Sequence, residues 1–324
     1  MFEELFSLTN LFYAWKKFKK GKSRKKDVIE FEYHLENNIF SLHADIISGN
    51  YRHGAYVYFQ VFDSKKRDIY KACVRDRIVH QVIYDYLNTI YESKFINDSY
   101  SSRIDKGNIR AIQILKYFSK LCSGSKYKNC YILKCDIKKY FQNIDHQILL
   151  TELNSKVMCT KTFAIIKNIV HSFLLDKNIK KGIPLGNITS QIFANIYLHK
   201  LQCRYYIRYN DDFVIVGLDK TKLEEIKKEI IIYVSQELYL EIPYNKTSIR
   251  KVTWGVDFLG YIILNNGILL RNKTKYKVFK NINPKNFTSY FGLLRWCNSY
   301  TLKQKIIALY TQEKYYFIDT EFKI

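Results

Sequence analysis

The sequence lacks the cysteine pattern of a disulfide framework or of a structural zinc site. It contains seven cysteines, an odd number, and no two of them form a C-x-x-C pair. Disulfide scaffolds pair their cysteines, and structural zinc sites usually draw on closely spaced thiols. We therefore expect reduced thiols that pack as small apolar groups.

We also expect no membrane span, no long linker and no secretory leader. No apolar run approaches the ~18 residues of a membrane-spanning helix. The first ten residues, MFEELFSLTN, carry acids where a signal peptide needs bases. There is no internal repeat and no long Gly-, Ser- or Pro-rich stretch. We expect a cytoplasmic protein without membrane contact, whose two or three subdomains pack directly on one another.

Acidic residues are few in comparison with basic ones. The 324 residues include 53 Lys and Arg against 30 Asp and Glu, which gives a formal net charge of +23. This surplus favours a polyanionic partner, although an AT-rich genome would also enrich Lys, Ile, Asn and Tyr. Residues 16–26 are the most basic run, with eight Lys or Arg. Such runs are usually solvated tails, but beside 28 Tyr and 21 Phe, contact with phosphates is at least as well supported.

Hydrophobic periodicity predicts a mixture of strands and helices. Strands are predicted at 56–62 and 131–137, on both sides of the NDD turn at 210–212, and in a hairpin around Asn266 and Gly267. Helices are predicted at 8–20 after an Asn or Thr cap, at 69–91, after a cap at Asp145, after a cap at Thr189 or Ser190, at 223–238, and over most of 275–318. The order of elements in the middle of the chain indicates a ferredoxin-like α+β centre flanked by helical parts.

Three acids define the candidate site. Asp211 and Asp212 lie between apolar runs in YYIRYNDDFVIVG, residues 205–217, where NDD taken alone is a good hairpin turn. Asp136 lies at the end of the apolar strand YILKCDI, and a carboxylate there needs a partner. If this strand lies beside the hairpin, three hard oxygen donors converge without nearby His or Cys, which favours Mg²⁺ or Mn²⁺. Two such ions ~4 Å apart would serve an in-line phosphoryl displacement.

Several blocks, in this order and spacing, resemble the motifs of a reverse transcriptase palm. They are CDIKKYFQNIDH (135–146), GIPLGNITSQIFANIYL (182–198), YNDD (209–212), Lys246 in PYNKTS, and FLGY (258–261). Residues 61–87 and 95–112 resemble the finger motifs of bacterial members, and 289–302 resemble their thumb, so that the similarity covers about residues 10 to 305.

The resemblance implies an RNA-directed DNA polymerase with the α+β right-hand polymerase fold, which has fingers, a ferredoxin-like palm and a helical thumb. A basic helical extension would occupy residues 1–50 and the fingers 51–130. The palm would follow at 131–270, with finger-contacting helices at 150–180, and the thumb at 271–324.

The resemblance also assigns roles at the catalytic centre. Asp136, Asp211 and Asp212 would hold two Mg²⁺ ions, or Mn²⁺, and Ile137 would belong to both the metal and the nucleotide sites. Lys246 resembles the lysine proposed to protonate the departing pyrophosphate.

Further residues would bind the nucleotide and the nucleic acid. Phe141 resembles the steric gate against a 2′-hydroxyl, although by itself it would be read as a core residue. The other predicted contacts to the incoming nucleotide or the nascent pair are Lys65, Arg67, Leu185, Gly186 and Gln191. The predicted contacts to nucleic acid are Arg103, Tyr209, Lys16, Lys17, Lys19 and Lys20.

The block LGNITSQ is similar to the form found in diversity-generating retroelements, because Leu185 stands where retroviral and group II intron enzymes usually carry Gln. Because the given sequence ends soon after the predicted thumb, we expect no ribonuclease H, maturase or endonuclease domain. The resemblance thus implies mutagenic retrohoming: a template RNA is copied from a primer, with deoxynucleoside triphosphates, into error-containing cDNA. It further implies a small basic accessory protein as partner.

Two alternatives stay open at this point. One is a phage-defence or group II-like reverse transcriptase. The other is a catalytically inactive RNA-binding module, although such a module would gain nothing from Asp136, Asp211 and Asp212 near phosphates.

The sequence departs from the family pattern in two places. Ser64 replaces the proline common before the finger lysine, and only residues 198–208 separate Tyr197 from Tyr209. A helix of about twelve residues leads ~18 Å away from the site and five strand residues return ~17 Å, so closure is possible with little slack around Gln202 and Cys203.

Overall fold

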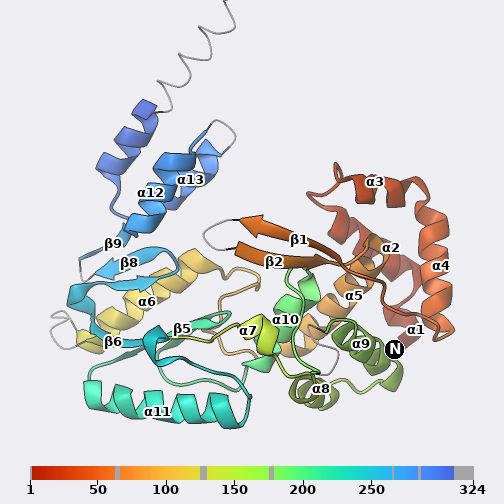
Figure 1. Cartoon of the computed structure of the whole chain (residues 1–324), viewed down its shortest axis with the longest axis horizontal. Coiled ribbons are helices and arrows are strands. Elements are labelled where there is room, and N and C mark those ends of the chain that lie inside the picture. Colours follow the sequence, from red (N-terminus) through yellow and green to blue (C-terminus); the bar gives the residue numbers. More distant parts are fainter. Residues whose placement is uncertain are drawn as a thin grey trace, which may run out of the picture. The chain divides into compact units, whose positions relative to one another are not determined.

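The computed structural model describes residues 2–62, 66–124, 130–174, 179–264, 266–283 and 286–309 (Figure 1). The chain forms two compact units. Unit 1 comprises residues 1–102, 136–202 and 229–244, and unit 2 comprises 103–135, 203–228 and 245–324. Each unit is therefore assembled from segments that lie far apart in the sequence. Within the described residues, no helix has the length and apolarity needed to cross a membrane.

Unit 1 begins with four helices, α1 (Phe2–Leu5), α2 (Leu8–Lys19), α3 (Lys26–Tyr33) and α4 (Leu35–Ile47). The buried face of α2 is formed by Leu11, Ala14, Trp15 and Phe18, and α2 packs on α4 and on α5 (Val74–Tyr91). The prediction of an Asn or Thr cap for α2 is wrong. Its cap is Ser7, whose hydroxyl accepts a hydrogen bond from the backbone N–H of Asn10 at 3.3 Å.

A two-stranded hairpin follows the N-terminal helices. β1 (Val57–Phe62) confirms the predicted strand, and it pairs antiparallel with β2 (Lys66–Lys71) in the register Val57↔Lys71 (Figure 1). The predicted helix over 69–91 is wrong at its start, because Ile69 to Lys71 belong to β2 and α5 begins only at Val74. Pairing with β1 outweighs the helical spacing of these residues.

Four further helices complete unit 1, namely α7 (Tyr140–Asn143), α8 (His146–Asn154), α9 (Thr160–His171) and α10 (Ile188–Tyr197). Asp145 caps α8 as predicted, because its side chain accepts from the N–H groups of Gln147 and Ile148. The prediction of Thr189 or Ser190 as the cap of α10 is wrong. The N-cap position is Asn187, and its side chain bonds to β2 instead of capping the helix.

Unit 2 contains the predicted ferredoxin-like sheet. Its strands are β3 (Tyr131–Asp136, in unit 2 as far as Cys135), β4 (Tyr206–Tyr209), β5 (Asp212–Gly217) and β6 (Thr247–Lys251), in the spatial order β4-β5-β3-β6. Helix α6 (Asn108–Ser123) packs on β4 and β5. Helix α11 (Lys220–Gln236, in unit 2 as far as Lys228) follows β5 and confirms the predicted amphipathic helix. The strands β4 and β5 confirm the predicted hairpin around NDD.

A second sheet in unit 2 consists of β7 (Val256–Phe258), β8 (Tyr261–Leu264) and β9 (Gly267–Leu270), and it contains the predicted hairpin at Asn266 and Gly267. Short 3-10 turns lie at Tyr244–Lys246, Val252–Trp254 and Leu294–Trp296. The C-terminal part is helical where it is described, in α12 (Asn272–Asn281), α13 (Phe287–Leu293) and residues 300–309. Residues 310–318 of the predicted helical region lie outside the described residues.

Candidate active site

The two neighbouring acids lie at the tip of the β4–β5 hairpin. Tyr209 pairs with Asp212, so that Asn210 and Asp211 form the turn. Asn210 has a φ of 55°, a left-handed conformation that Asn tolerates better than most residues. The strands behind the turn are largely buried. Both carboxylates are thus fixed at the end of a well-anchored hairpin, and both residues stay partly exposed.

Asp212 lies beside the C-terminal end of β3. The Lys134 ammonium is 3.7 Å from a carboxylate oxygen of Asp212 and also donates a hydrogen bond of 2.8 Å to the carbonyl of Asp257. Burial raises the pKa of the Cys135 thiol to about 12, the Lys227 ammonium counteracts this shift, and the Asp212 carboxylate adds to it. Strand β3 thus brings one cation to the hairpin acids.

Asp136 is the last residue of β3 and is half-buried. It belongs to unit 1, whereas Asp211 and Asp212 belong to unit 2. Among the residues that the structure describes, no group of three or more His, Cys, Asp and Glu side chains is gathered as a metal site. The convergence of the three carboxylates therefore stays a prediction. The donors of the hairpin nonetheless suit Mg²⁺, because they are hard carboxylate oxygens.

Lys246 lies near the same end of the sheet in unit 2. It closes the 3-10 turn Tyr244–Lys246 and immediately precedes Thr247, which pairs with Cys135 across β6 and β3. The backbone thus positions this lysine next to the strand end from which Lys134 approaches Asp212.

Phe141 and Ile137 follow Asp136 in unit 1. Ile137 is fully buried, and Phe141 is half-buried in α7. The carbonyl of Phe141 accepts a hydrogen bond of 2.8 Å from the N–H of Ile183, which holds α7 to the segment that leads into Leu185. The Phe141 ring packs edge-on against Tyr140, with the ring centres 5.5 Å apart. A partly exposed, fixed ring is compatible with the predicted steric gate.

The segment around Leu185 is bonded to strand β2. The carbonyl of Leu185 accepts from the N–H of Tyr70 at 2.9 Å, and Gly186 has a φ of 111° with its Cα close to the Ile69 side chain. Arg67 is exposed on the same strand, and Gln191 is exposed on α10. Lys65 lies outside the described residues. The structure thus joins two of the predicted nucleotide-binding segments, β2 and the Leu185–Gly186 loop.

The predicted nucleic-acid contacts are more dispersed. On α2, Lys17 donates to Asp85 at 3.0 Å and Lys19 pairs with Glu32, whereas Lys16 and Lys20 are exposed. Arg103 and Tyr209 are half-buried in unit 2. Their contact with nucleic acid stays a prediction.

The sequence analysis missed two charged residues near the hairpin. Lys134 lies two residues before Asp136, and the alternation of side chains along a strand would have placed both on one face. Arg208, in the apolar strand β4, is fully buried, and its positive charge counteracts the upward shift that burial causes in the pKa of Tyr206. Arg208 could have been identified from the sequence, because it is a charged residue inside an apolar run.

Comparison with known proteins identifies related chains. The family model described as reverse transcriptase (RNA-dependent DNA polymerase) matches residues 63–263. Protein YkfC of Escherichia coli is 23% identical over 307 residues, covering 79% of this chain and 78% of YkfC. The group II intron-encoded protein LtrA of Lactococcus lactis is 27% identical over 262 residues, covering 58% of this chain and 43% of LtrA.

Solved structures support the fold. Telomerase from Candida albicans, in complex with a fragment of telomeric RNA, has a TM-score of 0.50 at 13% identity, over 68% of this chain and 46% of the telomerase chain. This similarity confirms the predicted polymerase fold. The family match covers more than half of the chain and includes the YNDD hairpin, β3 and the Leu185 segment. The chain therefore belongs to the reverse transcriptase family, a family of RNA-directed DNA polymerases.

Proposed function

We propose that this chain copies a template RNA into cDNA by nucleotidyl transfer at Asp136, Asp211 and Asp212. The observation that supports this most directly is the hairpin, which fixes two adjacent carboxylates beside the end of β3. Besides burial, the Asp212 carboxylate raises the pKa of the Cys135 thiol, and Cys135 directly precedes Asp136 in β3. This supports the proposal that Asp136 acts together with Asp212. Bound Mg²⁺ ions would activate the primer hydroxyl and steady the leaving phosphate.

The chemistry that these residues serve is a substitution at phosphorus. The 3′-hydroxyl oxygen of the primer forms a bond to the α-phosphorus of the nucleotide, and the bond from that phosphorus to the bridging oxygen breaks. The hydroxyl proton passes to water, and Lys246 donates a proton to the departing pyrophosphate. Arg67 holds the triphosphate, and the ring of Phe141 excludes a 2′-hydroxyl.

We further propose that the copying is error-prone and serves a diversity-generating retroelement. Leu185 is the residue that supports this step. Its carbonyl accepts a hydrogen bond from the N–H of Tyr70. Its half-buried side chain offers only apolar contact to a nascent base pair. A Gln at this position would add a polar group that a mispair leaves unsatisfied. A small basic accessory protein would bind the polymerase in this context.

Sequencing of cDNA tests the error-prone assignment. The variant Leu185→Gln should lower misincorporation by roughly 5- to 150-fold, the scale of one unmade buried hydrogen bond, and most of all opposite template adenine. Wild type and variant would be compared on one RNA template. Equal error spectra in the two proteins would show that Leu185 does not cause the errors, and the retroelement assignment would lose the residue that supports it.

A second candidate is an intron-type polymerase. It is favoured by the relatives, because LtrA and a putative COX1/OXI3 intron 2 protein of Saccharomyces cerevisiae are both named for introns. Genome context separates the two, since a diversity-generating element carries a template repeat and a variable repeat near the polymerase gene.

A further inference from the structure

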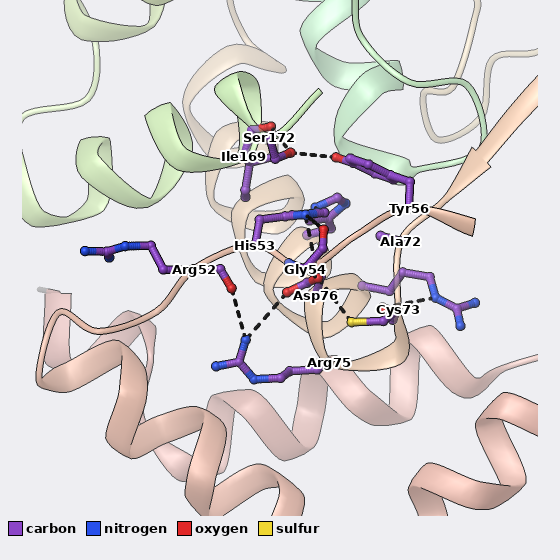
Figure 2. A network of polar contacts seen from close by, with 12 residues as sticks. Arg52, His53, Gly54, Tyr56, Ala72, Cys73, Arg75, Asp76, Ile169 and Ser172 are labelled. Carbon is purple, nitrogen blue, oxygen red and sulfur yellow. Dashed lines mark hydrogen bonds and ion pairs between the residues drawn. The ribbon is translucent and has the colours of Figure 1, made fainter. Parts of the chain in front are cut away.

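A buried carboxylate organises the start of α5. Asp76 is fully buried, and one of its oxygens accepts a hydrogen bond from the Tyr51 hydroxyl at 2.9 Å. The other accepts from the Gly54 N–H at 2.8 Å and the Cys73 thiol at 3.1 Å (Figure 2). A Cβ on Gly54 would lie 3.1 Å from Asp76, so only glycine fits here without a shift. Asp76 thus ties the segment that leads into β1 to the helix that follows β2.

A chain of hydrogen bonds continues from this segment to α10. The ring of His53 faces the carbonyl of Gly54 through Nδ1 at 2.6 Å and His80 Nε2 through Nε2 at 3.1 Å. His80 is fully buried, and its Nδ1 lies 3.2 Å from the hydroxyl oxygen of Thr189 in the first turn of α10.

The partners determine the protons in this chain. A carbonyl only accepts, so His53 Nδ1 carries the hydrogen, and in the neutral form of the His53 ring Nε2 accepts. His80 Nε2 therefore donates, and His80 Nδ1 accepts from the Thr189 hydroxyl. Burial, with the neighbouring His53 and Arg77, holds the pKa of His80 well below its ordinary value, which keeps this ring neutral. With a neutral His53, the relay thus runs in one direction, from the Thr189 hydroxyl through His80 and His53 to the carbonyl of Gly54.

The two ends of the hairpin are fixed by the same surroundings. Ahead of β1, the hydroxyls of Tyr56 and Ser172 lie 2.7 Å apart (Figure 2). Behind β2, the Asn187 side chain accepts from the N–H of Ala72 at 3.1 Å and donates to the carbonyl of Tyr70 at 2.8 Å. Asn187 and Thr189 belong to one segment, so α10 holds the exit of β2 directly and the entry of β1 through the two histidines.

This polar chain is buried at the link between Thr189 and His80 and partly buried between the two histidines, and it stabilises one geometry more than it stabilises the folded state. Apolar residues of similar size would fill this space without the desolvation that each polar group requires. What the network supplies is a unique relative position for the hairpin and for the segment Leu185–Thr189.

We propose that His53, His80 and Thr189 are positioning residues for nucleotide binding. Together they hold Arg67 on β2 and the Leu185–Gly186 loop in the one arrangement that accepts a deoxynucleoside triphosphate. This inference rests on the proposed function. Loss of the relay lets the hairpin populate other positions, and the apparent nucleotide affinity falls with the competent fraction.

The test compares two substitutions of one hydroxyl. Thr189→Val keeps the shape but removes the donor to His80, whereas Thr189→Ser keeps the donor. We expect Thr189→Val to raise the KM for deoxynucleoside triphosphates roughly 5- to 30-fold, with kcat within about twofold of wild type. The KM of Thr189→Ser should equal that of the wild type. The amides of Tyr70 and Ala72 should exchange hydrogen faster in Thr189→Val and not in Thr189→Ser.

A matched control removes one buried hydrogen bond elsewhere on α5. The Tyr91 hydroxyl donates to the carbonyl of Glu152 at 3.1 Å, and Tyr91→Phe deletes that bond alone. This variant should unfold at lower denaturant with an unchanged KM. An unchanged KM in Thr189→Val, an equal rise in Tyr91→Phe, or failure of Thr189→Ser to restore the KM would overturn the proposal.

The proposed function and this inference fail in different ways. Absence of primer extension by the wild-type protein would count against the proposed function. The exchange of Tyr70 and Ala72 needs no activity, and unchanged exchange in Thr189→Val would count against the positioning role alone.

Discussion

Gly186, one of the predicted nucleotide-binding residues, occupies a position that only glycine fits without strain. Its φ of 111° is strained for any other residue, and an added Cβ would lie 2.7 Å from the Cγ2 of Ile69. We expect Gly186→Ala to destabilise the protein by about 2 to 4 kcal/mol, from backbone strain and overpacking together. Denaturant unfolding measures this loss.

Gly49 offers a matched control for Gly186. It also has a positive φ, 76°, but nothing lies within 4 Å of an added Cβ. Gly49→Ala should therefore lose only the strain term, about 1 kcal/mol. An equal loss in the two variants would mean that contact between Gly186 and Ile69 is unimportant.

The site residues were predictable where they interrupt a pattern. Asp136, Asp211 and Asp212 stand out because they end or separate apolar runs. Lys134 did not stand out, because a lysine in a basic chain is usually solvated. Its contact with Asp212 depends on which strand lies beside β3, which the local sequence does not show. His53 and His80 are 27 residues apart and meet only because Asp76 folds the segment before β1 onto α5.

At the scale of elements, local pattern predicted the strands and most helices, and tertiary pairing decided the exceptions. Asp145 caps α8 because its carboxylate accepts from the N–H groups of Gln147 and Ile148 in the first turn of the helix. Asn187 stands at the N-cap of α10, but its side chain is taken by β2. For the same reason Ile69 to Lys71 join a strand in spite of their helical spacing. Neither partner is visible from the neighbouring sequence.

Buried histidines in α5 and α8 make stability depend on pH. His80 and His146 are fully buried, and burial holds the pKa of each below its ordinary value of 6.5. As the pH falls through about 6.5, the unfolded chain takes up protons that the folded chain does not. The stability that these two neutral histidines contribute is therefore fully present above about pH 6.5 and decreases as the pH falls below it.

The expected loss for His80 is up to about 1.4 kcal/mol per pH unit below its unfolded pKa. Urea unfolding at about pH 7.5 and about pH 5.5 measures it. His80→Phe should flatten this dependence, whereas His34→Gln, at an exposed position, should leave it unchanged. An equal pH dependence in wild type and His80→Phe would contradict the assignment.

The whole molecule carries a charge of +23, which should dominate its affinity for RNA. If ~6 to 10 phosphates are neutralised, affinity falls by about 10³ to 10⁵ between 50 and 200 mM salt. Removing two exposed lysines, Lys16 in α2 and Lys20 directly after it, in Lys16→Gln/Lys20→Gln, should reduce the slope of log affinity against log salt by about 1 to 2. Binding isotherms at several salt concentrations give both slopes. An unchanged slope in the variant would place the RNA away from α2.

Primer extension by wild type and Asp212→Asn tests the central claim most directly. Both proteins would be given one RNA template, a DNA primer, deoxynucleoside triphosphates and Mg²⁺, and RNA affinity would be measured beside extension. We expect the wild type to extend the primer and Asp212→Asn not to extend it. The RNA affinity of the variant should be intact or slightly raised, because a negative charge near the phosphates is gone. Substantial extension by Asp212→Asn would contradict the catalytic role of the hairpin, and tight RNA binding without extension by the wild type would indicate an inactive RNA-binding module.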